Sequence, residues 1–107
     1  MGAIIDATNI FLSKGKEKKL GENISIKELE QYDKELYDLL NFYEYDTIYE
    51  VLISNPKDLR KINEFTEEHY GKLLYFLDKA GFNTDNLIYN CPYNFATVMN
   101  VYIRLKS

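Results

Sequence analysis

Apolar side chains recur along this chain at intervals of three and four residues, which is the spacing of the buried face of an amphipathic helix. The first such stretch covers residues 2–13. The next follows Ser25, a residue type that favours the N-cap position, with Glu28 three residues later to complete a capping box. We expect a single helix from there, with an apolar face made of Leu29, Tyr32, Leu36, Leu39, Leu40 and Tyr43.

Helix signals continue in the second half of the chain. Asn55 and Pro56 combine an N-cap with a proline at the first helical position. Thr66 begins another helix, and Gly81 ends it in the left-handed conformation. Gly71 lies inside this helix and is expected to weaken it by up to about 1 kcal/mol relative to alanine.

Two segments fit a helix or a strand. Residues 47–53 are rich in β-branched side chains, although Asp46 or Thr47 is a suitable cap for a short helix. Residues 95–105 also alternate as a strand does, but Pro92 just before them favours a helix. The predicted fold is therefore mostly α, a small compact bundle of about five helices. The alternative is α+β, with short strands near 47–53 and 95–105.

Length and composition fit one domain that spans residues 1–107, with a basic flexible loop at about 13–23. The single cysteine, Cys91, cannot form an internal disulfide, which suits a reducing cytoplasm. No stretch approaches the roughly 20 apolar residues that span a bilayer. We therefore expect a cytoplasmic protein that does not enter membranes.

Charge is concentrated in the middle of the chain. The net charge of the whole sequence is −4, but residues 28–50 hold eight acids and one lysine. An acidic surface repels nucleic acid and attracts basic proteins. Direct binding to a nucleic-acid duplex is therefore not expected.

The sequence shows no catalytic or metal-binding motif. Its one histidine, His69, and its one cysteine, Cys91, are not spaced as zinc ligands are, and there is no glycine-rich phosphate loop. His69 follows Glu68 on a charged helix face, so we expect a solvent-exposed histidine. The sequence predicts a protein that is not an enzyme and needs no cofactor or metal.

The stretch from Tyr32 to Glu50 is the main functional lead, because it holds five tyrosines, six carboxylates and a single lysine. Tyrosine is enriched at protein interfaces. Carboxylates three or four residues apart on a helix lie about 5–6 Å from each other and can resemble phosphates to a basic partner. The predicted partner-binding residues are Glu30, Asp33, Tyr37, Asp38, Glu44 and Tyr45.

These features predict a small acidic protein-binding module whose partner is a protein with a basic surface. The specific hypothesis is an inhibitor that docks on a nucleic-acid-binding surface, like a phage-type, anti-CRISPR-like antagonist of a bacterial defence nuclease. The alternatives are an immunity protein or antitoxin that neutralises a basic toxin, and a homo-oligomeric structural subunit without a charge-led partner. The test that the sequence suggests is the reversal of Asp33, Asp38 and Glu44 to lysine.

Overall fold

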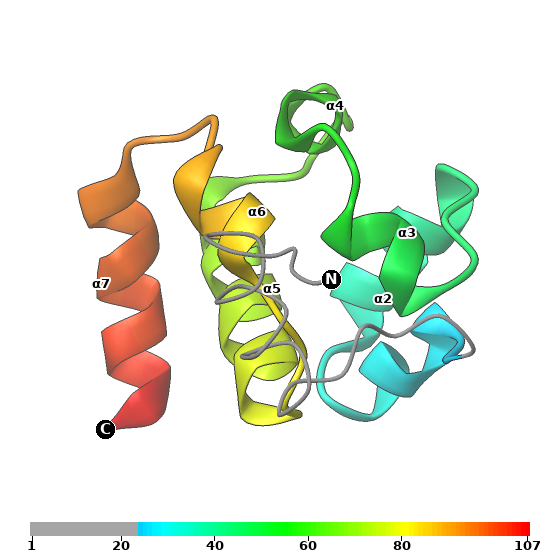
Figure 1. Cartoon of the computed structure of the whole chain (residues 1–107), viewed down its shortest axis with the longest axis horizontal. Coiled ribbons are helices and arrows are strands. Elements are labelled where there is room, and N and C mark those ends of the chain that lie inside the picture. Colours follow the sequence, from blue (N-terminus) through cyan, green and yellow to red (C-terminus); the bar gives the residue numbers. More distant parts are fainter. Residues whose placement is uncertain (1–23) are drawn as a thin grey trace, which may run out of the picture.

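The computed structural model describes residues 24–107, in which every named element is a helix (Figure 1). In chain order the elements are the 3-10 helix η1 (Ile26–Gln31) and the α-helices α2 (Lys34–Phe42), α3 (Ile48–Leu52), α4 (Pro56–Arg60), α5 (Glu67–Lys79), α6 (Asp85–Tyr89) and α7 (Phe95–Lys106). The predicted mostly α-helical fold is confirmed. The alternative with strands is wrong, because its two segments form α3 and α7. The helix expected over 2–13 and the basic loop at about 13–23 lie outside the described residues.

Polar side chains begin most of these helices. Thr47 caps α3 and forms a capping box with Glu50, whose carboxylate accepts from the Thr47 N–H at 3.0 Å. Asn55 caps α4 with Pro56 at its start, and Thr66 caps α5, as predicted. Each cap satisfies a backbone N–H that has no partner within its own helix.

The single helix expected after Ser25 is wrong, because the chain forms η1 and α2 with a break between them. Asp33 has extended backbone angles, and its Oδ1 accepts a hydrogen bond from the Leu36 N–H at 3.1 Å. It is therefore the N-cap of a new helix. Ser25 caps η1 through the Lys27 N–H at 3.0 Å, without the predicted capping box with Glu28. Within residues 24–107 the chain forms seven helical pieces, of which α2, α5 and α7 are substantial, whereas the sequence suggested about five helices for the whole chain.

The end of α5 follows the prediction. Gly81 has a φ of 90°, which is the left-handed conformation that glycine adopts without strain. Its N–H donates to the Asp78 carbonyl, and the Phe82 N–H donates to the Leu77 carbonyl, both at 3.0 Å. This Schellman arrangement turns the chain sharply and buries Phe82.

All seven helices contribute to one hydrophobic cluster within residues 24–107. Its fully buried members include Leu36, Leu40, Ile48, Leu59, Leu73, Leu77, Leu87 and Val98. The buried Tyr70 hydroxyl donates to the Leu87 carbonyl at 2.6 Å, so this ring adds a hydrogen bond between α5 and α6. No helix in the described part is long and apolar enough to cross a membrane.

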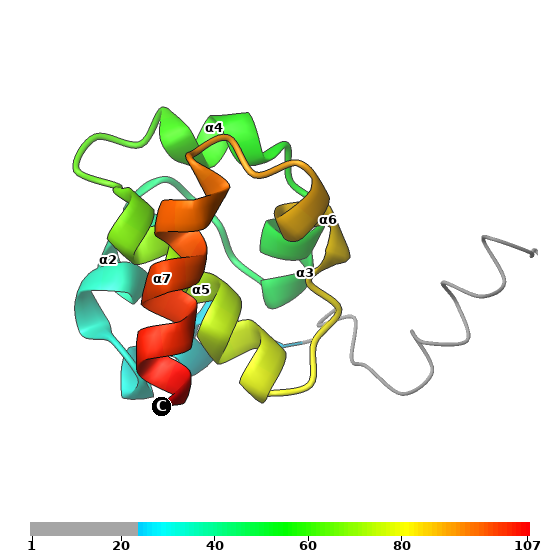
Figure 2. The same ribbon diagram turned by 90° about the vertical axis from the view of Figure 1, so that its left-hand side faces the viewer.

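The two longest helices, α5 and α7, pack closely side by side (Figures 1 and 2). Gly71 of α5 faces α7 at the contact. A Cβ atom built on Gly71 would lie 2.6 Å from the Val101 Cβ and 2.8 Å from the Val98 carbonyl oxygen. Gly71 is therefore needed for the approach of the two helices, which outweighs its low helix propensity.

Candidate protein-binding surface

The six residues predicted to bind a partner do not share one face. The chain breaks at Asp33 and turns again after α2, so their side chains enter different surroundings. The exposed members are Asp38 and Glu44, and the partially buried members are Glu30, Asp33, Tyr37 and Tyr45. The single outward face inferred from the sequence is therefore wrong.

Asp33 stabilises the fold. Besides capping α2, its Oδ2 accepts a hydrogen bond from Lys72 Nζ of α5 at 2.9 Å, and the side chains of this ion pair are mostly buried. Partial burial alone would raise the pKa of Asp33, but the Lys72 ammonium and the Leu36 N–H favour the charged form and hold the pKa below its ordinary value. Reversal of Asp33 to lysine would therefore damage the protein, which makes the test suggested by the sequence ambiguous.

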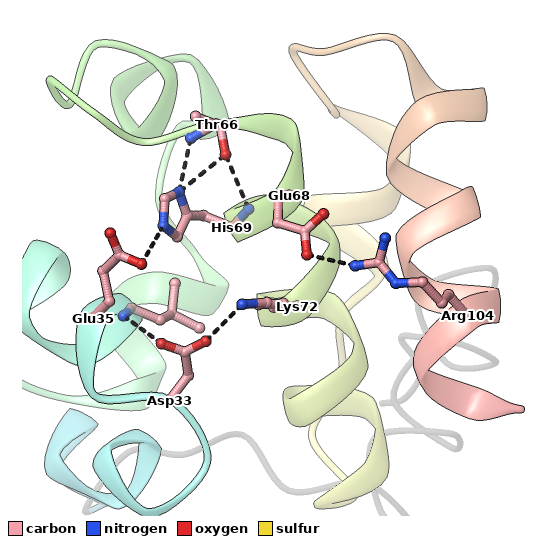
Figure 3. A network of polar contacts seen from close by, with 8 residues as sticks. Asp33, Glu35, Thr66, Glu68, His69, Lys72 and Arg104 are labelled. Atoms are coloured by element: carbon pink, nitrogen blue, oxygen red, sulfur yellow. Dashed lines mark hydrogen bonds and ion pairs between the residues drawn. The ribbon is translucent and has the colours of Figure 1, made fainter.

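A polar network joins α2, α5 and α7, as Figure 3 shows. His69 is only 8% exposed, so the expected surface histidine is wrong. Its Nδ1 accepts from the Thr66 N–H at 3.1 Å, and its Nε2 lies 3.4 Å from the Glu35 carboxylate. An accepting Nδ1 assigns the proton of the neutral ring to Nε2, which faces Glu35. On the other side of α5, Glu68 pairs with Arg104 of α7.

The spacing Thr66-x-x-His69 explains the burial of His69. It is the spacing of a capping box, in which the third helical residue reaches back to the N-cap N–H. His69 takes the place that glutamate or glutamine usually occupies in this motif. Its imidazole also packs against Phe65, with 5.4 Å between the ring centroids. The capping-box spacing was present in the sequence, but it was not recognised because histidine is not one of the residues that the motif usually contains.

Tyr37 and Tyr45 both pack against the hydrophobic core. Burial raises the pKa of Tyr45, and the nearby carboxylates of Asp58 and Glu50 add to this effect, while a hydrogen bond with Ser54 opposes it. Tyr45 is therefore a partly buried ring that packs against the core and bonds to Ser54, which precedes α4. The sequence suggested that both side chains are fully exposed, but part of each ring is buried and cannot contact a partner.

The acids near the start of the candidate stretch have local ion pairs. Lys34 Nζ lies 3.0 Å from Asp38 Oδ2, one turn along α2, and Lys27 Nζ lies 3.8 Å from Glu30. All four side chains are at least one third exposed, so water screens these pairs and they contribute little to stability. They also reduce the charge that this side of the molecule offers to a partner.

Two aromatic rings are exposed where α2 ends. Phe42 is 77% exposed, and its ring meets the Tyr43 ring edge to face, with 5.2 Å between centroids. The Tyr43 hydroxyl accepts from the Asn63 N–H at 3.3 Å, which joins the turn after α2 to the turn before α5. Tyr32 and Tyr43, which we expected in the core, are 44% and 41% exposed because Tyr32 precedes the break and Tyr43 follows the last helical residue.

Glu44 and Asp46 follow Tyr43 in the turn after α2, and Glu64 follows Asn63 in the turn that the Tyr43 hydroxyl contacts. Glu44 and Glu64 adopt positive φ angles of 70° and 72°, which are uncommon for residues other than glycine and asparagine. Within residues 24–107, no basic side chain lies within the 4.0 Å ion-pair distance of the carboxylates of Glu44, Asp46 or Glu64. We call Phe42, Tyr43, Glu44, Asp46 and Glu64 the aromatic–acidic tip.

Sequence reasoning missed Phe42 and Glu64. Phe42 lies two residues after the buried Leu40, which places it about 200° around the helix from the core face. A phenylalanine so far out of phase with the apolar stripe is the signal that would have identified it. Glu64 lies close to Tyr43 only because of the tertiary fold, which no local pattern indicates.

The described residues contain no cluster of histidine, cysteine and carboxylate side chains that could hold a metal ion. Cys91 is half-buried, and burial raises the pKa of its thiol. The arrangement of this part of the chain suits recognition through surface rings and carboxylates. No protein-family model, curated protein or solved structure matches the chain.

Proposed function

We propose that this protein is a small acidic binding module that inhibits a target protein by docking the aromatic–acidic tip on the target's basic, nucleic-acid-binding surface. The observation that carries the proposal is Phe42, a 77% exposed phenylalanine two residues before Glu44, whose carboxylate has no ion-pair partner within residues 24–107. A ring of this kind is a suitable anchor for a protein interface, where aromatic residues provide much of the binding energy.

Charge supports the same proposal. The stretch from residue 28 to 50 holds eight acids and one lysine. It contains α2, and most of the tip follows the end of that helix. Complementary charge speeds association and fixes the orientation of the partners. Arginine side chains that bind phosphates can pair with the tip carboxylates and stack on Phe42 and Tyr43.

This mode of binding would compete with nucleic acid for the target. The carboxylates would occupy phosphate positions, and the two rings would offer the flat apolar surface that a base offers. The target class that we propose is a bacterial defence nuclease, by analogy with small acidic phage inhibitors in size and charge.

The test compares the wild type with two double charge reversals of equal size. Glu44→Lys/Glu64→Lys changes the tip, and Glu28→Lys/Asp38→Lys changes acids outside it by the same net charge. Each protein is immobilised and incubated with a nuclease-treated bacterial lysate, and circular dichroism verifies that all three are folded. Captured proteins are identified and then tested for displacement of a fluorescent oligonucleotide by the wild-type protein.

We expect a basic nucleic-acid-binding protein that the wild type and the control reversal retain and the tip reversal loses. Its retention should decrease as salt screens the charges. Equal retention by the tip reversal would refute the role of the tip. A captured protein that releases no oligonucleotide would refute the nucleic-acid-binding surface as the target, and a basic toxin would favour the immunity-protein alternative.

A further inference from the structure

A groove lies between η1, the start of α3 and the end of α5, on residues that the tip does not use. Its volume is about 260 Å³, and its apolar lining includes Leu29, Tyr32, Ile48, Phe76 and Leu77. A cavity of about 150 Å³ holds a benzene-sized molecule, whereas sites for drug-sized ligands occupy roughly 300–1,000 Å³. The size of the groove therefore suits a ligand of one ring with a short substituent.

The groove has a preformed aromatic wall. Tyr32 is the C-cap residue of η1, and its ring stacks on Phe76 of α5 with 5.0 Å between centroids and 17° between planes. The next residue, Asp33, forms an ion pair at 2.9 Å with Lys72, which lies one turn before Phe76 on the same helix. These contacts hold the Tyr32 ring in place, although Tyr32 is 44% exposed. A wall that is already in position lowers the cost of binding a ligand.

A carboxylate lies at the same groove. Glu28 is exposed and belongs to the groove lining. Gln31 Nε2 donates to Glu28 Oε1 at 3.3 Å and to the Glu28 carbonyl oxygen at 3.0 Å, and these bonds orient the carboxylate. Within residues 24–107 no basic side chain lies within the 4.0 Å ion-pair distance of this carboxylate, and none belongs to the described lining. The polar side of the groove therefore carries a negative charge.

The aromatic wall and the carboxylate together favour a flat cation. The face of an aromatic ring is negative and attracts a positive charge placed over it. A planar amidinium or guanidinium group can stack on a ring and can also donate two parallel hydrogen bonds to a carboxylate. A round ammonium group lacks this planar pair of donors, and the Glu28 carboxylate repels an anion.

We propose that the groove binds a small organic molecule that carries an amidinium or guanidinium group, with its apolar body against Tyr32 and Phe76 and its cation beside Glu28. This inference is independent of the proposed function, because it involves neither the tip nor the protein partner. A ligand bound there would contact η1 and α5 at once and should therefore stabilise the folded chain.

Three probes of nearly equal shape test this recognition in the full-length chain: benzamidine, which is a cation at neutral pH, neutral benzamide and anionic benzoate. Binding is followed by NMR through the methyl signals of Leu29, Ile48 and Leu77, which line the groove. We expect saturable shifts of these signals with benzamidine, several-fold weaker binding of benzamide and the weakest binding of benzoate. Equal affinity for the three probes, shifts confined to residues outside the groove, or no saturable binding would overturn the proposal.

Two variants separate the Glu28 carboxylate from the net charge of the protein. Glu28→Gln keeps an acceptor for Gln31 and removes the charge, and Glu44→Gln is the same substitution at an exposed acid outside the groove. Glu28→Gln should lower the affinity for benzamidine to that for benzamide, and Glu44→Gln should leave it unchanged. Circular dichroism verifies that both variants are folded. An equal loss in the two variants would mean that benzamidine responds only to net charge, and the site would be refuted.

Tyr32→Leu tests the aromatic wall, because leucine is apolar but cannot stack on a flat cation. We expect several-fold weaker binding of benzamidine, and an unchanged affinity would refute stacking as the basis of recognition. N-acetylarginine amide completes the test, because it carries the guanidinium group of a protein side chain. If it binds more tightly than benzamidine, the groove is a site for an arginine of another protein, and the small-molecule proposal is wrong.

Discussion

The α5–α7 pair and the segment from η1 to α3 are held together by different interactions. In the pair, two long helices approach closely at Gly71, and a methyl group there would collide with Val101 and the Val98 carbonyl. In the segment, three helices begin at the capping side chains of Ser25, Asp33 and Thr47. Shape determines the first region and polar contacts determine the second. Acids in the segment are thus divided between those that fix the fold, such as Asp33, and those that remain exposed, such as Glu44.

The largest expected effect is in the pair. Gly71→Val places a branched side chain where a Cβ atom would already lie 2.8 Å from the Val98 carbonyl oxygen. Overpacking of this kind costs about 1–3 kcal/mol and sometimes more, and the backbone contact places this case at the upper end. We expect the free energy of unfolding in urea to decrease by about 3 kcal/mol.

A matched control is Asn100→Val, which adds the same side chain at an exposed position of α7. It should change the free energy of unfolding by less than about 0.5 kcal/mol. Helix propensity alone predicts that Gly71→Val is stabilising. A stabilising result would therefore contradict the close approach of α5 and α7 at Gly71.

A smaller effect is expected at the polar junction of the segment. Asp33→Ala removes the N-cap of α2 and the ion pair with Lys72, which should cost about 1–2 kcal/mol at neutral pH. The pKa of Asp33 is lowered in the folded state. Its stabilisation is therefore complete above the unfolded-state pKa of about 3.9 and is lost as the pH falls through the lower folded-state pKa.

The measurement is urea unfolding of both proteins across a series of pH values. The difference between wild type and Asp33→Ala should be constant from about pH 5 to pH 8 and decrease in stronger acid. Asp38→Ala is the control, because Asp38 is an exposed acid in a helical ion pair, and its loss should be much smaller than the loss in Asp33→Ala. Equal losses for the two variants would mean that Asp33 has no special role.

Local signals in the sequence predicted much of the fold. The predicted starts of α4 and α5 are confirmed, and so is the end of α5 at Gly81. Each of these features depends on a residue type with a strong conformational preference. The break at Asp33 was missed, since an aspartate within an apolar stripe fits both an outward helical position and an N-cap. Only the tertiary contact with Lys72 distinguishes the two.

The candidate site was less predictable than the fold. The sequence directed attention to the acidic stretch, which stays a prediction, but grouped its residues by helical angle, and this grouping failed because the helix is interrupted at Asp33. Glu44 remained exposed, whereas Tyr37 and Tyr45 packed against the core. The proximity of Tyr43 to the turn that holds Glu64 depends on the Asn63 hydrogen bond, a contact between residues 20 positions apart.

Tyr102→Phe tests a polar contact inside the α5–α7 pair. The Tyr102 hydroxyl donates to the Asp78 carboxylate, and this hydrogen bond, together with burial, raises the pKa of Tyr102 to about 12. Loss of the bond should cost roughly 1 kcal/mol. The raised pKa means that the stabilisation is complete below the unfolded-state pKa of about 10 and disappears as the pH rises through about 12.

The same urea titrations, extended to alkaline pH, provide the measurement. Tyr89→Phe is the control, because the Tyr89 side chain is 82% exposed and its variant should match the wild type at every pH. A loss in Tyr102→Phe that exceeds the loss in Gly71→Val would contradict the view that shape, and not polar contact, determines the α5–α7 pair.

The smallest expected effect on stability concerns the tip. Phe42→Ser removes a mostly exposed ring, so the free energy of unfolding should change by less than about 0.5 kcal/mol. Leu40→Ala, two residues away in the fully buried face of α2, should cost about 2–5 kcal/mol. If Phe42→Ser instead destabilises the protein by more than about 1 kcal/mol, its ring supports the turn that carries Glu44 and is not free to serve as an anchor. If stability is unchanged while capture of the partner is lost, the Phe42 ring acts in binding alone. Leu40 would then serve folding and Phe42 recognition, although the two residues lie in the same helix, α2.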